Sequence, residues 1–119
     1  MPFKSADSAL PLTPISFEIL LALLQGELHG YAILQAVEGR LTGKLPLRTG
    51  TMYRALARLA ETGLIAAAAR RRAADAGDER RNYYRITDAG IRVARAEVRR
   101  LEALMRAARI GGLLGKAAK

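Results

Sequence analysis

Hydrophobic residues recur along this 119-residue chain at the three- and four-residue spacings of amphipathic helices. The first such run starts at Thr13-Pro14, a pair typical of an N-cap followed by proline at the first helical position. The run extends to about Leu24, and Gly26 is expected to end the helix. A second helix is predicted to begin near His29-Gly30 and to carry Ile33, Leu34 and Val37 before Gly39, and Gly43 and Pro46 mark the next connection.

A third helix is predicted within residues 48–59, and its two sides differ in chemistry. At about 100° per residue, the apolar side carries Met52, Leu56 and Leu59, and the opposite side carries Thr51, Arg54 and Arg58. The apolar stripe would hold the helix on a small core, which leaves the basic stripe outside. Gly63 is expected to stop this helix.

The segment after Gly63 gives conflicting signals. Alanines 66–69 favour a helix by intrinsic propensity, but residues 82–86 alternate and are aromatic or β-branched, as in a strand. A strand of that length needs a partner, and residues 64–70 are the nearest candidate. We therefore predict a β-hairpin over these two segments.

A final helix is expected to begin after the cap residue Thr87 and to end at Gly111-Gly112. Its apolar positions step by three and four residues, a 3.5-residue period typical of helix-on-helix packing. These positions are Ile91, Ala94, Val98, Leu101, Met105 and Ala108. A basic amphipathic helix can also lie on a membrane, but the regular stepping and the interspersed alanines favour a dimer seam.

Composition narrows the class of protein. Half of the residues are hydrophobic, which is enough for one small domain with a core. The net charge of +9 and the pI of about 10.8 favour polyanionic partners without choosing between them. There are no cysteines, and His29 is the lone histidine. This composition rules out disulfides and most zinc or copper sites, so no metal or cofactor is expected.

No segment has the features of a membrane span or a signal peptide. The longest apolar run, residues 15–24, contains Glu18 and is about half as long as the roughly twenty residues that a spanning helix needs. No long apolar core precedes a small-residue cleavage site near the N-terminus. We therefore expect a soluble, cytoplasmic protein without a membrane partner.

The third helix carries one group of candidate DNA contacts. The candidates are Thr49, Thr51, Tyr53, Arg54 and Arg58. Hydroxyls and free backbone N–H groups at a helix start can bind phosphate, and arginines can reach guanine edges. The ordinary alternative is a solvated charged face with Glu61 nearby, and the whole set of residues favours DNA. For Tyr53, half-buried packing and a phosphate hydrogen bond stay equally open.

The loop of the predicted hairpin carries a second group of cations. Acidic residues lie toward its tip and arginines toward its stems; the arginines are Arg70, Arg71, Arg72, Arg80 and Arg81. A hairpin would bring the two arginine clusters together, so contact with the DNA backbone is favoured over a self-neutralised loop. No sequence readout is assigned to these side chains.

The order of these segments resembles the PadR family of winged-helix transcriptional regulators. The matching segments are residues 19–24, His29-Gly30-Tyr31-Ala32-Ile33, residues 50–59, Gly63-Leu64-Ile65 and residues 81–90. The resemblance implies a mostly α fold with a small β-hairpin. A flexible arm (1–12) would precede a winged helix-turn-helix domain (13–87), a C-terminal dimerisation helix (88–112) and a basic tail (113–119).

The resemblance also implies a homodimeric repressor whose third helix enters the major groove of double-stranded DNA, with the hairpin as a wing. This chain departs from relatives by having Thr49 where proline is frequent, and by its alanine-rich first wing strand. It has no tryptophan to stack a flat aromatic ligand between subunits, so nothing identifies a small-molecule effector.

Other classes of function are weighed against this one. A non-specific nucleic-acid-compacting protein would use the same basic faces, and an adaptor would dock its winged helix on another protein. His29 at a glycine turn is interpreted as a local structural residue. No nucleophile–base set or phosphate-binding loop indicates an enzyme.

Overall fold

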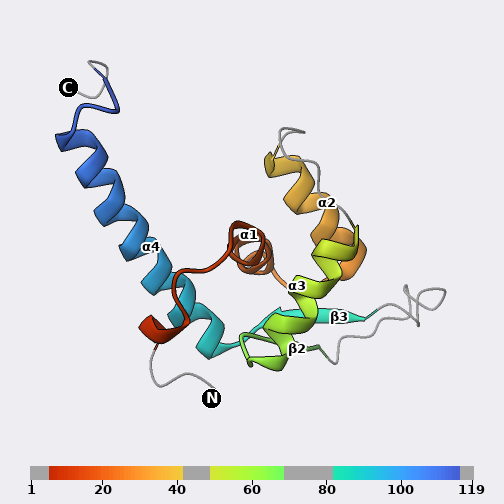
Figure 1. The fold of residues 1–119 in the computed structure, drawn as a ribbon. Coiled ribbons are helices and arrows are strands. Elements are labelled where there is room, and N and C mark those ends of the chain that lie inside the picture. Colours follow the sequence, from red (N-terminus) through yellow and green to blue (C-terminus); the bar gives the residue numbers. More distant parts are fainter. Residues whose placement is uncertain (1–5, 42–48, 69–81, 116–119) are drawn as a thin grey trace.

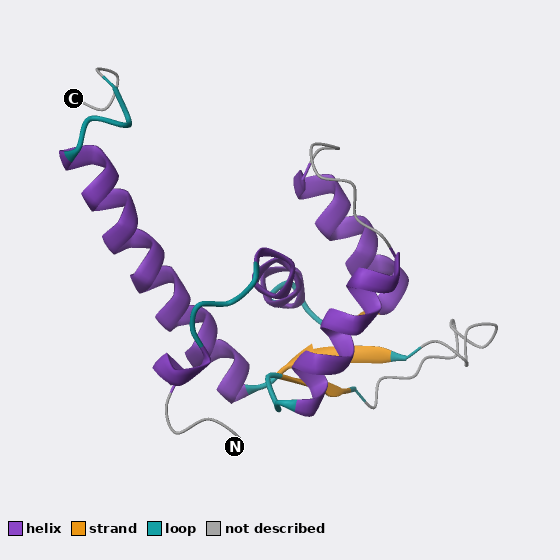
Figure 2. Cartoon of the chain, viewed as in Figure 1, coloured by secondary structure: helices purple, strands orange, loops and turns teal. Residues whose placement is uncertain are grey.

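The structure, a computed structural model, describes residues 6–41, 49–68 and 82–115. Its helices and strands are, in chain order, η1 (Ala6–Ala9), α1 (Pro14–Leu23), β1 (Leu28–His29), α2 (Gly30–Leu41), α3 (Thr49–Glu61), β2 (Ile65–Ala67), β3 (Tyr83–Ile86) and α4 (Asp88–Ile110). Figure 1 shows α1 in the middle, with α2 and α3 on one side and α4 on the other. The strands lie beside α3, at the base of α4 (Figure 2).

The central helix α1 begins as its sequence predicts. The Thr13 hydroxyl accepts a hydrogen bond from the Ser16 backbone N–H at 3.1 Å, and Pro14 occupies the first helical position. Half of the helix is buried, including Ile19, Leu20, Ala22 and Leu23. Because α2, α3 and α4 all pack on α1, this helix forms the middle of one shared hydrophobic core.

Helix α2 continues through Gly39 and ends at Leu41. A glycine inside a helix costs only about 1 kcal/mol relative to alanine, which a tertiary contact can offset. Arg40, just beyond the glycine, pairs with Glu18 of α1. This ion pair attaches the last turn of α2 to the central helix.

The predicted hairpin is confirmed, and a third strand joins it. β2 and β3 pair antiparallel, with Ile65 opposite Ile86. β1 pairs antiparallel with the other side of β3, with Leu28 opposite Tyr84, so the strand order is β1-β3-β2. A two-residue strand has too little sequence to show alternation, which is why the pattern did not predict β1.

The start of α4 is fixed to the turn that follows α3. Thr87 caps the helix by accepting a hydrogen bond from the Gly90 N–H at 3.0 Å, and its hydroxyl donates to the Gly63 carbonyl at 2.7 Å. Gly90 lies so close to this turn that an added Cβ would be 2.2 Å from the Leu64 carbonyl oxygen. Only glycine fits there without a backbone shift.

The second half of the expected N-terminal arm packs against the protein. Within residues 6–12, η1 contacts α4, and Ala6, Ala9, Leu10 and Leu12 are partly buried against the core. The Leu12 backbone N–H hydrogen-bonds to Glu97 of α4, a side chain that is 2% exposed. Residues 1–5 of the arm and residues 116–119 of the expected basic tail lie outside the described residues. None of the described helices is both long and apolar enough to span a membrane.

Candidate nucleic-acid interface

Helix α3 has the two chemically distinct sides that its sequence predicts. Met52, Leu56 and Leu59 are 0%, 1% and 3% exposed and belong to the core. Arg54 and Arg58, on the opposite side, are exposed. These two arginines are four residues apart, so they lie one above the other along a single face. The core thus fixes the orientation in which α3 presents its cations to solvent.

The two arginines of α3 have no acidic partner among the described residues. In particular, neither forms an ion pair with Glu61, the neighbour expected in the ordinary interpretation of a solvated charged face. A Nη2 donor of Arg54 lies 3.4 Å from the Thr51 hydroxyl, a long and therefore weak hydrogen bond. Thr51 is half-buried, whereas the side chain of Thr49, the first residue of α3, is not described.

Tyr53 lies where α3 meets the start of α2. An added Cβ on Gly30 would be 2.9 Å from Cε1 of the Tyr53 ring and 3.0 Å from its hydroxyl oxygen. The ring therefore packs on the backbone of Gly30, yet Tyr53 remains 43% exposed. This contact fixes where the hydroxyl of Tyr53 lies.

The sheet adds an outward face next to this helix pair. Tyr84 and Ile86 of β3 pack on the core, so the alternation of a strand directs Tyr83 and Arg85 to the other side. Arg85 is exposed, and sequence reasoning missed it as a candidate cation although the same alternation indicates it. The arginines of the predicted wing loop, at 70–72 and 80–81, lie outside the described residues.

His29 has the structural role that the sequence favours. Its Nδ1 accepts a hydrogen bond from the Ala32 backbone N–H at 3.2 Å, which caps the first turn of α2. Its ring meets the Tyr83 ring edge-on, with centroids 5.3 Å apart and planes at 85°. This histidine therefore connects α2 to the sheet. The described residues hold no group of three or more metal-ligating side chains.

Part of the apolar stripe expected at the dimer seam packs into the chain's own core. Ala94 is 7% exposed and belongs to the core, whereas Val98 and Met105 are 41% and 47% exposed. The other members, Ile91, Leu101 and Ala108, are half-buried. The stripe therefore starts at the core and runs out along α4 onto its exposed distal half.

Several solved structures that are similar to this chain are transcriptional regulators. One from Clostridium thermocellum is 26% identical, with a TM-score of 0.65 over 80% of this chain and 86% of that one. A PadR family transcription regulator from Clostridium difficile is 23% identical, with a TM-score of 0.67 over 87% of this chain and 100% of that one. The similarity in architecture confirms the predicted winged-helix fold.

A third structure is Bacillus subtilis PadR in complex with operator DNA, which is 24% identical with a TM-score of 0.60. The match covers 74% of this chain and 47% of that one. No curated protein sequence matches the chain significantly. The model of the transcriptional regulator PadR-like family matches residues 19–96, from the central helix through the sheet into α4. The chain therefore belongs to the PadR-like family of transcriptional regulators.

Proposed function

We propose that this protein is a dimeric DNA-binding repressor of transcription that reads a roughly palindromic operator with α3 and contacts the DNA backbone with a basic wing. The observation that carries the proposal is the exposed side of α3, where Arg54 and Arg58 face solvent without an acidic partner among the described residues. The B. subtilis PadR structure with operator DNA supports the same use of the fold.

The chemistry of α3 matches the major groove of B-form DNA, which is about 12 Å wide and admits one helix. Arg54 can donate two parallel hydrogen bonds to O6 and N7 of a guanine. Arg58 lies one turn further along the same face, about 6 Å away, and can reach a neighbouring base or phosphate. Thr51 and the free N–H groups at the start of α3 can bind a phosphate. Tyr53, held on Gly30, can donate its hydroxyl to another.

The wing and the dimer complete the proposed contact. Arg70, Arg71, Arg72, Arg80 and Arg81 would neutralise backbone phosphates, which strengthens binding to every sequence and makes it salt-dependent. Two copies related by a two-fold axis would present two α3 helices to half-sites about one helical turn apart. Occupying such a site near a promoter would block transcription.

Fluorescence anisotropy tests the proposal with the duplex upstream of this protein's own gene and a scrambled duplex of equal length. Near physiological salt, we expect the upstream duplex to bind about a thousandfold more tightly. Arg54→Ala should weaken specific binding by about 1–3 kcal/mol and relax base preference, whereas Arg71→Ala should weaken all duplexes alike and flatten the salt slope. Arg106→Ala, an exposed arginine on α4, is the matched control.

The net charge of +9 favours one competing function, the non-specific compaction of nucleic acid. That function predicts equal, steeply salt-dependent binding to unrelated duplexes. Unchanged affinity and preference in Arg54→Ala would rule out α3 as the reading element. Negligible binding to every duplex would move the protein to the adaptor class.

A further inference from the structure

Helix α4 leaves the rest of the protein at Glu97. All the buried residues of this helix lie in its first half: Gly90, Val93, Ala94, Ala96 and Glu97. From Glu97 the helix continues to Ile110, which at 1.5 Å per residue is about 20 Å. Figure 1 shows this second half extending away from the other helices. Its direction is therefore decided by the contacts of the first half.

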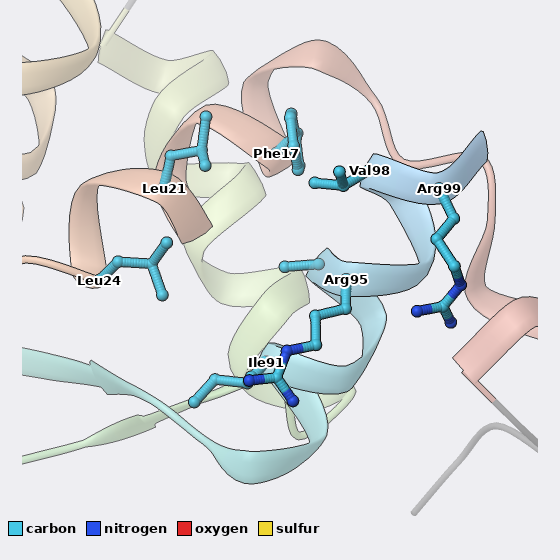
Figure 3. A pocket seen from close by; sticks show the side chains of 8 residues that line it. Phe17, Leu21, Leu24, Ile91, Arg95, Val98 and Arg99 are labelled. Atoms are coloured by element: carbon cyan, nitrogen blue, oxygen red, sulfur yellow. The ribbon is translucent and has the colours of Figure 1, made fainter. Parts of the chain in front are cut away.

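On the side of α1, the packing leaves α4 room to tilt. An apolar pocket of about 410 Å³ lies between the two helices, and its lining includes Phe17 and Leu21 of α1 and Ile91 and Val98 of α4 (Figure 3). A close-packed interface has few voids larger than a water molecule, so this interface alone does not hold α4 at a single angle. The angle must be fixed by a second contact.

On another face of α4, the N-terminal segment (residues 6–12) connects this helix to the start of α1. Its η1 turn packs on α4, and the chain then reaches Thr13, the N-cap of α1. The Leu12 backbone N–H donates to the carboxylate of Glu97, a side chain that is 3% exposed. Arg100 donates to both oxygens of the same carboxylate, at 2.9 Å and 2.7 Å. Glu97 thus joins the last buried turn of α4 to the segment that leads into α1.

Stability alone does not explain a buried carboxylate at this contact. Replacing a buried ion pair with apolar side chains of similar volume is often neutral or stabilising. A hydrogen bond, however, weakens steeply as its angle departs from linearity, whereas the hydrophobic effect is not directional. Because Arg100 holds both oxygens of Glu97, the carboxylate accepts the Leu12 N–H at one angle of α4. An apolar side chain would allow many angles.

A small change in this angle becomes large at the far end of α4. A tilt of about 10° at Glu97 moves Ile110 by roughly 3.5 Å, because the helix between them is about 20 Å long. That displacement equals the rise of about one base pair, since a turn of about 10 base pairs rises about 34 Å. In a dimer held through α4, the angle therefore sets how far apart the two α3 helices lie.

We propose that Glu97 is a positioning residue that, through Leu12, fixes the angle of α4 and thereby the half-site spacing that the protein accepts in its operator. The inference rests on the dimeric repressor of the proposed function, and it assigns the choice of spacing to a residue that does not touch DNA. The choice of half-site sequence stays with α3. A change at Glu97 therefore alters the accepted spacing and leaves base preference as it is.

Distances within one chain test the angle without DNA. The chain has no cysteine, so Gln35→Cys on α2 and Ala107→Cys on α4, both at exposed positions, accept one spin label each. Double electron–electron resonance on labelled protein diluted with unlabelled protein gives the distance distribution between the two helices. Glu97→Leu should broaden this distribution by about 2–3 Å, the displacement that a tilt of about 10° gives at position 107. Ile33→Val removes one methyl group from a buried side chain of α2 and is the matched control for lost stability; it should keep the parent distribution.

Selection of duplexes from a random-sequence pool tests the spacing. The parent should enrich two half-sites at one spacing, whereas Glu97→Leu should enrich the same half-sites at several spacings. In fluorescence anisotropy with the selected duplex, one base pair inserted between the half-sites should weaken binding by the parent about tenfold or more, and binding by Glu97→Leu less than about threefold. Glu97→Gln keeps one oxygen that can accept the Leu12 N–H, so its loss should lie between these two. Ile33→Val should discriminate between spacings like the parent.

A Glu97→Leu protein with the parent's distance distribution, or with the parent's discrimination between spacings, would overturn the inference. If the parent still enriches paired half-sites in that case, the proposed function stands without this role for Glu97. If the parent enriches no paired half-sites, the proposed function fails, and the role of Glu97 in spacing fails with it. Far-UV circular dichroism checks that each variant is folded, and Glu97→Gln supplies the same comparison if Glu97→Leu does not fold.

Discussion

Replacing Glu97 tests how the N-terminal segment is fixed to α4. Glu97 is the one buried charged residue among those described. Its Oε1 accepts from Arg100 Nε at 2.9 Å, its Oε2 accepts from Arg100 Nη2 at 2.7 Å, and its carboxylate also accepts from the Leu12 backbone N–H. The change Glu97→Gln keeps the shape of the side chain and removes its charge.

The expected cost follows from these three contacts. The Arg100 side chain is 34% exposed, so water weakens this ion pair, and we assign it about 1 kcal/mol. The amide also turns an N–H₂ group toward a donor, which costs roughly another 0.5–1 kcal/mol of hydrogen bonding. We therefore expect Glu97→Gln to lower the free energy of unfolding by about 1–2 kcal/mol. With a urea m-value of about 1–3 kcal/mol/M, the midpoint should fall by roughly 1 M.

The same contacts make this loss depend on pH. The Arg100 side-chain hydrogen bonds lower the pKa of Glu97 below its ordinary value of 4.5; burial acts in the opposite direction, and the Leu12 N–H lowers it further. Because the folded pKa lies below the unfolded one, the carboxylate's contribution is complete above about pH 4.5. It disappears as the pH falls through the folded value.

Urea denaturation of the parent and of Glu97→Gln, at one protein concentration and at pH 7 and pH 3, measures both effects. Holding the concentration fixed keeps any contribution from self-association constant. The difference in unfolding free energy should shrink at pH 3, because below about pH 4.5 the unfolded chain takes up a proton at this carboxylate that the lowered pKa of folded Glu97 resists. Glu38→Gln, at an exposed glutamate of α2, should match the parent at pH 7. An equal difference at both pH values would refute the role assigned to the Glu97 charge.

Three further substitutions test contacts that position the proposed DNA-binding surface. Gly90→Ala brings a methyl group within 2.2 Å of the Leu64 carbonyl oxygen. Thermal denaturation should show a free energy of unfolding lower by about 2–3 kcal/mol, and stability equal to that of the parent would contradict this close approach. Thr87→Ala removes the cap of α4 and the hydrogen bond to Gly63, which should lower the free energy of unfolding by about 1–2 kcal/mol. Thr87→Ser should retain most of that free energy. Gly30→Ala displaces the Tyr53 ring, so in fluorescence anisotropy its affinity for DNA should fall as much as that of Tyr53→Ala, with little loss of stability. Full affinity for DNA in Gly30→Ala would argue against a role for Tyr53.

Local signals in the sequence predicted much of the fold. Thr13 and Thr87 cap their helices because a side-chain oxygen next to an apolar run can satisfy a free N–H at the helix start. The two sides of α3 follow from a helical period alone, and the residues of β3 follow from alternation. Each of these features depends only on residues that are close together in the sequence, so a local sequence pattern is enough to predict it.

Features that depend on distant partners could not be predicted in this way. β1 exists because Leu28 pairs with Tyr84, a residue far away in the sequence. Helix α2 continues past Gly39 to Arg40, which pairs with Glu18. Glu97 of α4 is buried where the distant N-terminal segment packs on that helix. The apolar pocket between α1 and α4 likewise depends on how these two helices pack against each other, which no local pattern in the sequence shows.

The most direct test of sequence-specific DNA binding is selection of duplexes from a random-sequence pool by the parent protein, near physiological salt. Because every short sequence is present in such a pool, the selection itself identifies the operator. The proposed function predicts enrichment of a roughly palindromic sequence whose half-sites lie about one helical turn apart, with Arg54→Ala losing the preference at one position of each half-site. A pool that stays unenriched while total binding falls steeply with salt would contradict it.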